Sequence, residues 1–278
     1  MPASPKKTTT VKKNILFVSQ EIFPYLADPT PIRELNRHLP EFCKAKGWET
    51  RTFMPKFGDI NERRNQVHEV IRLSGLNLIV DETDRPLVVK VASIMSAKIQ
   101  IYFIDNEDFF HKRKGIVDPT TGVDYADNDE RCIFFSRGAI ETLRKVCWGP
   151  DIIYCSGWMS ALVPFYVRTA FKNDPFFNHA KIVFALDNQS FNKPFSTKFA
   201  NKLMLPSILQ SDVRSLAGLP VQWEDLMRFG IEYSDVVMLN EEKVNQRLIN
   251  YAENNKKQLV PFNGLDKEKY FEIFENLV

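Results

Sequence analysis

A chain of 278 residues, 44% of them hydrophobic, can bury a full core as one large domain or two small ones. Its 37 basic and 35 acidic residues nearly cancel, so no overall field favours nucleic acid, and its apolar runs are too short to cross a membrane. The four cysteines stand far apart without a CxxC pair, which gives no sign of a zinc site or a disulfide framework. Free thiols in a cytoplasmic protein are the simplest interpretation.

The first elements predict an α/β unit. The basic, threonine-rich start, residues 1–13, has the composition of a disordered tail. The apolar run Asn14–Ser19 predicts a buried strand, and Thr30 followed by Pro31 marks the start of a helix. A second strand is expected over Glu49–Met54. This order predicts parallel strands with a right-handed crossover, as in a Rossmann-like, mostly parallel sheet flanked by helices.

The middle of the chain departs from this pattern. Residues 66–105 contain short alternating runs separated by turn residues, which predict antiparallel strands or a hairpin beside the parallel sheet. Further on, helices are expected over Asp129–Lys145 and Trp223–Tyr233. Buried strands are expected over Lys181–Asn188 and Ser234–Asn240.

One stretch, PDIIYCSGWMSALVPFYV at residues 150–167, predicts a short strand, a tight turn at Ser156-Gly157 and a helix that opens near Trp158. In open α/β sheets, ligands bind at the carboxyl ends of strands, where such a turn lies. The loop-rich segment 192–219 is a candidate for a mobile cover over the same cleft.

Three stretches carry motifs that can be compared with a known family. Residues 102–145 run from YFIDNEDFF through DYADNDERCIFFSRGAIE, residues 150–164 are PDIIYCSGWMSALVP, and residues 258–266 are QLVPFNGLD. They resemble YFIDxPxYF…DYPDNxERFxFFSRAALE, PDIVHxHDWHTALVP and GILNGID of bacterial glycogen and starch synthases, glycosyltransferase family 5. The resemblance implies that residues 14–266 form the N-terminal Rossmann-like domain of a two-domain GT-B fold. Residues 267–278 would then be a helix at the interdomain crossover.

Within these stretches the polar positions differ from those of the family. The family has His, His, Asp and His where this chain has Tyr154, Ser156, Gly157 and Met159. Its sugar-nucleotide loop KTGGL is replaced by ADPTPI at Ala27–Ile32. Glycines in such loops let backbone N–H groups approach phosphate, so no diphosphate contact is expected from this loop. The resemblance implies a kept scaffold with altered donor and acceptor contacts.

Five residues are candidates for sugar binding: Asp127, Asn128, Trp158, Asp187 and Asn188. Asp187 replaces a histidine of the family after a third strand, so three altered loops are expected at one edge of the sheet. Structural alternatives stand beside these candidates: Asp127 and Asn128 suit a helix start, Trp158 suits the core, and Asp187 suits a turn. We identify no catalytic residue, and we expect no metal and no cofactor, with ADP-glucose as a possible donor substrate.

Two functions follow from the resemblance. The first is an enzyme component that works with a separately encoded second GT-B domain on ADP-glucose and an α-1,4-glucan. Alone it would be inactive, because one wall provides neither leaving-group stabilisation nor water exclusion. The second is a non-catalytic pseudoenzyme that binds an α-glucan or maltooligosaccharide, or that regulates glucan metabolism. Neither function involves nucleic acid or a membrane, and both are expected in the cytoplasm.

Overall fold

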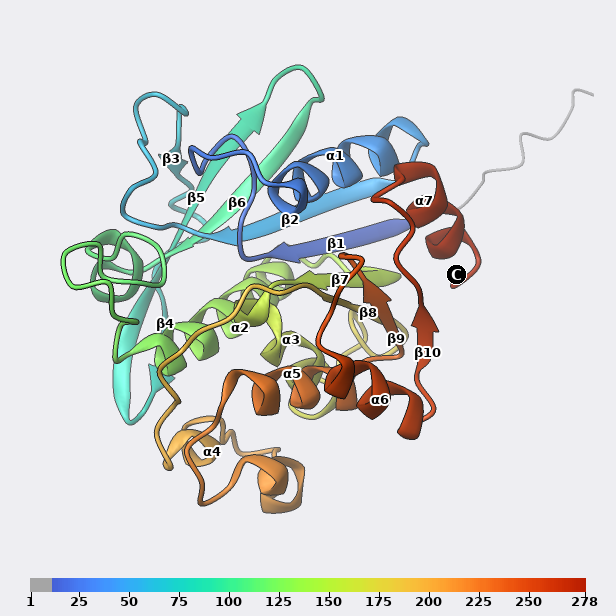
Figure 1. The fold of residues 1–278 in the computed structure, drawn as a ribbon. Coiled ribbons are helices and arrows are strands. Elements are labelled where there is room, and N and C mark those ends of the chain that lie inside the picture. The colour runs from blue at the N-terminus through green and yellow to red at the C-terminus, as the bar shows by residue number, and fades with distance from the viewer. Residues whose placement is uncertain (1–11) are drawn as a thin grey trace, which may run out of the picture.

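The computed structural model describes residues 12–278, within which ten strands form one sheet (Figure 1). The predicted tail, residues 1–13, lies almost wholly outside this range. Across the sheet the strand order is β10-β9-β8-β7-β1-β2-β6-β5-β3, with β4 beside β5. The strands are β1 (Asn14–Ser19), β2 (Glu49–Pro55), β3 (His68–Glu69), β4 (Leu76–Val80), β5 (Thr83–Ile94), β6 (Ile99–Asp105), β7 (Ile152–Ser156), β8 (Lys181–Leu186), β9 (Val236–Leu239) and β10 (Gln258–Val260).

The sheet is parallel from β10 through to β6. β5 turns back antiparallel to β6, and β3 and β4 pair antiparallel with β5. The prediction of a Rossmann-like, mostly parallel sheet is therefore confirmed, and so is the antiparallel hairpin predicted within residues 66–105. The central strands β1, β7 and β8 are buried along most of their length, which their near-continuous apolar runs explain.

Helices cover both faces of the sheet (Figure 1). One face carries α1 (Pro31–Ala45) and α7 (Lys267–Glu275), and the other carries α2 (Asn128–Lys145), α3 (Leu162–Arg168) and α5 (Trp223–Glu232). The remaining α-helices are α4 (Phe199–Lys202) and α6 (Gln246–Asn254), and α6 packs against α5. Short π or 3-10 helices span Glu107–His111, Trp158–Ser160 and Gln210–Leu216. Among residues 12–278, no helix combines the length and apolar character that a membrane crossing requires.

The start of α1 follows its predicted local chemistry. Thr30 Oγ1 accepts a hydrogen bond from the backbone N–H of Arg33 at 3.3 Å, and Pro31 occupies the first turn. The apolar side of α1 packs on the sheet together with α7, whose Phe271 ring meets Trp48 edge-on at 5.2 Å. These two helices therefore close one face of the central strands.

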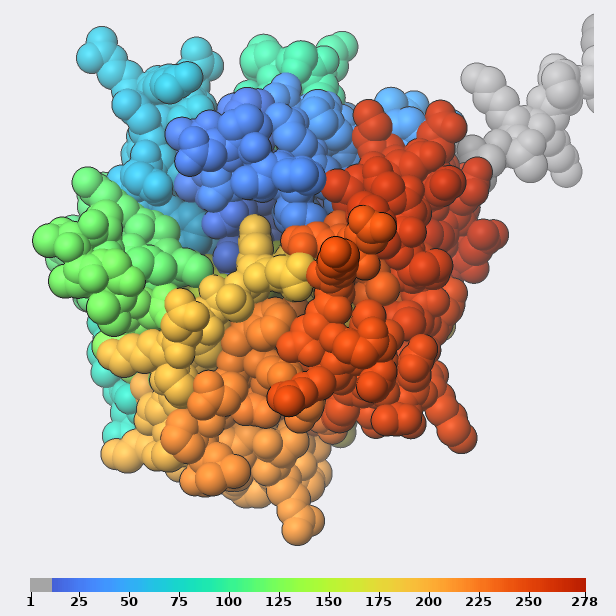
Figure 2. All heavy atoms as spheres, viewed as in Figure 1, coloured from blue at the N-terminus to red at the C-terminus, as the bar shows by residue number. Residues whose placement is uncertain are grey.

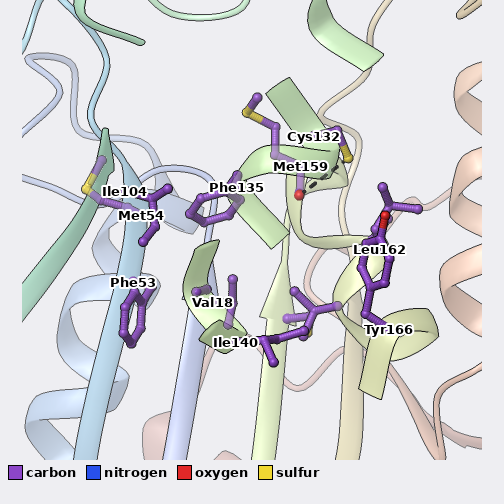
Figure 3. Close-up of a cluster of buried hydrophobic side chains, with 14 of the residues drawn as sticks. Val18, Phe53, Met54, Ile104, Cys132, Phe135, Ile140, Met159, Leu162 and Tyr166 are labelled. Carbon is purple, nitrogen blue, oxygen red and sulfur yellow. Dashed lines mark hydrogen bonds between the residues drawn. The ribbon is translucent and has the colours of Figure 1, made fainter. Parts of the chain in front are cut away.

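The opposite face holds the larger part of the core. Figure 3 shows part of this layer, with Phe53 of β2 at one side, Val18 of β1 and Ile140 of α2 between, and Leu162 and Tyr166 of α3 at the other side. All five side chains are buried. Burying a large apolar side chain contributes roughly 1.5–3 kcal/mol, so this layer holds the strands in fixed positions. The loops that leave the strand ends are positioned as a consequence.

Candidate functional site

The candidate site lies where the parallel strands end. β1, β7, β8 and β9 are neighbours in the sheet, so their carboxyl ends share one edge. The loop Ala27–Ile32 follows β1, the turn at Gly157 follows β7, and Asp187 follows β8. The three loops that differ from the family therefore belong to adjacent strands, as the sequence predicts. Ligands of open α/β sheets bind at this edge.

Polar side chains end these strands on the face covered by α1 and α7. Phe17 and Tyr154 contact that layer, and strand alternation places Ser19 and Ser156, two residues further on, on the same face. Both serines are buried, and neither hydroxyl has a hydrogen-bond partner. Ser19 is not among the candidates predicted from the sequence, although it is a polar residue at the end of an apolar strand, a pattern that indicates a ligand-binding position.

Two further polar groups with an unpartnered atom stand at this edge. Asp187 is fully buried and its Oδ2 has no partner. Asn36 of α1 is 2% exposed; its Nδ2 donates to the backbone oxygen of Glu21 at 3.0 Å, while its Oδ1 is unpartnered. Buried polar atoms are normally hydrogen-bonded, so a concentration of free ones indicates a place where a ligand or water binds.

The carboxyl of Asp187 has a raised pKa. Its Oδ1 accepts a hydrogen bond from the backbone N–H of Gln189 at 3.0 Å, as in an Asx turn. Burial nevertheless raises the pKa of Asp187 to about 7, and the nearby carboxylates of Glu241 and Glu21 add to the rise. Near neutral pH this group is present in both protonation states, so it can donate or accept a hydrogen bond.

Two linked, buried hydrogen bonds lie beside this group of polar side chains. Tyr270 of α7 donates its hydroxyl to Asn240 Oδ1 at 2.6 Å, and Asn240 Nδ2 donates to the hydroxyl of Tyr154 at 2.8 Å. Burial raises the pKa of Tyr154 well above its usual value. Tyr154 stands where the family has a histidine, and it acts here as a neutral structural partner of β9 and α7.

The loops after β1 and β7 are held in contact by Gly157. Its φ is +83°, and a Cβ built on it would lie only 2.6 Å from Cβ of Gln20. Gln20 Oε1 accepts a hydrogen bond from the backbone N–H of Met159 at 3.2 Å. An aspartate, as in the family, would not fit this position without movement of the β1 loop.

The first turn of α1, directly after the β1 loop, contains one arginine, and that arginine is already paired. Arg33 Nε lies 2.8 Å from Glu21 Oε2, and Gln189 Nε2 donates to the same oxygen at 3.1 Å. The side chains of Glu21 and Arg33 are less than one-fifth exposed. This cluster links the β1 and β8 loops, and the charge of Arg33 is paired with that of Glu21.

Trp158 is fully buried beneath the segment that follows β8. Its ring meets the rings of Phe191 and Phe195 at 5.0 and 5.9 Å, and its Nε1 has no hydrogen-bond partner. Asp124 fastens this segment, because its Oδ2 accepts the backbone N–H of Asn192 at 2.6 Å and of the next residue at 2.8 Å. We call residues 187–198 the strap; its yellow to gold course crosses the face seen in Figures 1 and 2. In this arrangement Trp158 has no surface for a sugar.

Asp127 and Asn128 begin α2, but neither caps it through its side chain in the way the sequence suggests. Asp127 makes no capping hydrogen bond; its Oδ2 lies 3.2 Å from Arg113 Nη2, and its buried Oδ1 is unpartnered. Asn128 is 2% exposed, donates to the oxygen of Ile116 at 2.9 Å and accepts from Arg131 at 2.6 Å. Asp127 thus keeps a free oxygen, whereas both ends of Asn128 are occupied.

Asn188 is the exposed member of the five candidates. Its Nδ2 donates to Glu241 Oε2 and to the backbone oxygen of Lys243 at 2.6 Å. The backbone N–H of Asn188 also donates to Glu241 Oε1 at 3.3 Å. These bonds join the ends of β8 and β9, while the side chain stays open to solvent.

A second group of side chains has the spacing of a metal site. Ligand atoms of Glu62, Asp105 and His111 lie within 4.8 Å of one another. However, Lys90 Nζ lies 2.7 Å from Glu62 and 2.8 Å from Asp105, and Lys56 Nζ lies 3.0 Å from Glu62. Partial burial works against the charge of Glu62, but the two ammonium groups outweigh it and lower the pKa of this carboxyl. The lysines thus occupy the place of a cation.

An open, mostly parallel sheet with a polar carboxyl edge defines a ligand-binding domain of the Rossmann-like class. Residues 14–258 match the family model described as the starch synthase catalytic domain, and the chain belongs to this family. It is 36% identical over 226 residues to a glycogen synthase of Chlorobaculum parvum, covering 80% of this chain and 44% of that protein. It is 30% identical over 275 residues to one of Pelodictyon phaeoclathratiforme, covering 95% and 55%.

The fold is also similar to a solved structure, the catalytic domain of starch synthase IV from Arabidopsis thaliana bound to ADP and acarbose. The TM-score is 0.71 at 16% sequence identity, covering 91% of this chain and 51% of that one. This likeness supports the fold. The chain spans about half the length of the curated relatives it matches.

Proposed function

We propose that this domain is the first wall of a glycogen synthase-like system and that it binds an α-glucan or maltooligosaccharide at the carboxyl edge of its sheet. The observation that carries the proposal is the row of buried polar atoms without partners at Ser19, Ser156 and Asp187. Sugar hydroxyls both donate and accept hydrogen bonds, and they would satisfy such atoms. Asp187 supports this role because its two protonation states coexist near neutral pH.

The proposal includes a separate second GT-B domain as the source of the donor site, with ADP-glucose as donor. Departure of a nucleoside diphosphate requires positive groups or N–H donors at the phosphates. The β1 loop offers neither lysine nor glycine at Ala27–Ile32, and Arg33 is bound to Glu21. We place the system in the cytoplasm, which the unpaired cysteines among the described residues support.

The purified chain of 278 residues is expected to show no transfer of glucose from ADP-glucose to glycogen. The physical reason is that the β1 loop has neither lysine nor glycine at Ala27–Ile32 to stabilise the leaving diphosphate, and that Arg33 is paired with Glu21. Incorporation of labelled glucose into glycogen measures the activity, with a full-length glycogen synthase as the positive control. Turnover above the protein-free blank would overturn this part of the proposal.

A non-catalytic glucan-binding or regulatory role is the second candidate function. It is favoured by the replacement of the family's histidine with the buried carboxyl of Asp187 and by the neutral pairing of Glu21 with Arg33. Under this alternative the second domain is not required for function. Addition of a family second domain to the transfer assay separates the two, since only the first candidate predicts that activity appears.

The synthase-like function and the non-catalytic glucan-binding role both predict binding of maltohexaose to the chain. Asp127→Ala and Asp187→Asn are each expected to weaken that binding roughly tenfold, since a hydrogen bond to a charged group contributes about 1.5 kcal/mol or more. Titration calorimetry measures the affinity, and Asp118→Ala, in the loop before α2, is the control that should leave it unchanged. Trp158→Ala is unsuitable, because removing this buried ring would cost about 3–5 kcal/mol of stability. Absence of maltohexaose binding would contradict the synthase-like function and the glucan-binding role alike.

A further inference from the structure

Two adjacent hollows lie at the opposite edge of the sheet from the candidate site. β2 and β6 begin at this edge, and α1 and α2 end there. The hollows have volumes of about 640 and 580 Å³, and both are lined by Arg51, Gln100 and Tyr102. The length of β2, roughly 20 Å at about 3.3 Å per residue, separates them from the carboxyl edge.

The walls of these hollows are strongly basic, although the chain as a whole is nearly balanced in charge. Against the single carboxylate of Glu49 stand six basic side chains: Lys12, Lys44, Arg51, Arg72, Lys98 and Lys145. Lys44 and Lys145 donate to backbone oxygens, of Lys98 and of Ser74. Within residues 12–278, Arg51, Arg72 and Lys98 form no ion pair. Their charges are available to a ligand.

Arg51 is the central group, because it belongs to both hollows. Its guanidinium lies 5.2 Å from the ring of Trp148 and 5.7 Å from that of Tyr102, and its Nη1 donates to the Tyr102 hydroxyl at 2.9 Å. Its Nε is buried without a partner. Aromatic neighbours fix the orientation of a guanidinium without neutralising it. The remaining donors are therefore held ready for an anion.

We propose that the two hollows form one binding site for a small phosphorylated ligand, with Arg51 and Arg72 as its main phosphate-binding groups. Guanidinium groups match the geometry of phosphate oxygens, and two of them on one hollow suit a phosphate dianion or a diphosphate. Arg51 is only partly exposed, so an anion reaches it by entering the hollow. A duplex or a membrane surface would contact the exposed Arg72 and Lys98 but not Arg51. This site is independent of the proposed glucan function.

Titration calorimetry with inorganic pyrophosphate tests this site at physiological ionic strength, where charge interactions are screened beyond roughly 8 Å. We expect saturable binding of one pyrophosphate per chain. Arg72→Ala and Arg51→Gln are each expected to weaken it roughly tenfold, the effect of losing one charge-assisted hydrogen bond. Arg214→Ala is the matched control, because Arg214 is also exposed but lies in the short 3-10 helix Gln210–Leu216, which lines neither hollow. Its affinity for pyrophosphate should equal that of the wild-type chain.

The outcomes are distinct. Equal binding by the wild-type chain and by Asp187→Asn, with weaker binding by Arg72→Ala, supports the site even if Arg51→Gln does not fold. No saturable binding, or binding that Arg72→Ala leaves unchanged, overturns the proposal. A changed affinity for pyrophosphate in Asp187→Asn, in either direction, also overturns it, since the anion would then bind at the carboxyl edge. An RNA oligonucleotide that binds through Arg72 but not Arg51 would identify a polyanion surface instead.

Discussion

Replacing Asp187 by asparagine is expected to remove one large contribution to the pH dependence of stability between about pH 4 and about pH 7. Burial raises the pKa of this carboxyl to about 7 in the folded chain, from an ordinary value of 3.8. Between these values the folded chain holds a proton that the unfolded chain has released. The free energy of unfolding therefore falls as the pH rises, by up to about 4 kcal/mol, and the stabilisation is complete only below the lower value.

Urea unfolding of the wild-type chain and of Asp187→Asn at a series of pH values measures this effect. The difference between their unfolding free energies should grow with pH in favour of the variant. Asp118→Asn is the matched control, because Asp118 also accepts a hydrogen bond from the N–H two residues on, Thr120, at 2.8 Å, but in an exposed turn. Parallel curves for the wild-type chain and Asp187→Asn would contradict the burial argument.

Arg131→Met is expected to lower the free energy of unfolding by about 3–5 kcal/mol. The Arg131 side chain is fully buried and donates to the oxygens of Phe109 at 2.6 Å and Gly115 at 2.7 Å, and to Asn128 Oδ1 at 2.6 Å. Methionine fills similar space but has no donor, so three acceptors would lose their partner. Urea unfolding followed by circular dichroism measures the loss.

Arg144→Met tests whether the effect belongs to the buried position. Arg144 lies on the same helix, is 44% exposed, and pairs with Glu141 and Asp174 at 2.9 Å each. Exposed pairs contribute little, so this variant should lose less than about 1 kcal/mol. Arg131→Lys, which keeps the charge but not the three-way geometry, should fall between the two. Similar losses for Arg131→Met and Arg144→Met would show that the buried network is not what stabilises this region.

Much of the fold could be predicted because its signals are local. β1 has the predicted bounds, Asn14–Ser19, and α1 starts at Pro31 after its Thr30 cap. A short apolar run and a cap each depend on a few consecutive residues. α6 (Gln246–Asn254) was missed because only Leu248 and Ala252 among its residues are buried. With so few apolar positions, the helical periodicity of the sequence is weak.

The place of the candidate site could be predicted, but its packing could not. Three loops altered relative to the family follow neighbouring parallel strands, and strand order alone brings them to one edge. Arg131 donates a hydrogen bond to Phe109, and the ring of Phe191 packs on Trp158. Both contacts join residues that are far apart in sequence. No pattern in the chain encodes those contacts. Asp127 shows the same limit, since its Oδ2 pairs with Arg113 and neither oxygen caps the helix N–H groups.

The strap over Trp158 has a consequence for measured affinity. A sugar can stack on this ring only in molecules in which Phe191 and Phe195 have moved aside and the two N–H groups have left Asp124. If a fraction f of molecules is open, the apparent dissociation constant exceeds the intrinsic one by 1/f. A mutation of Asp124 would then strengthen stacking without touching the ligand. The opening equilibrium of the strap would then set the sugar concentration at which half of the Trp158 rings are occupied.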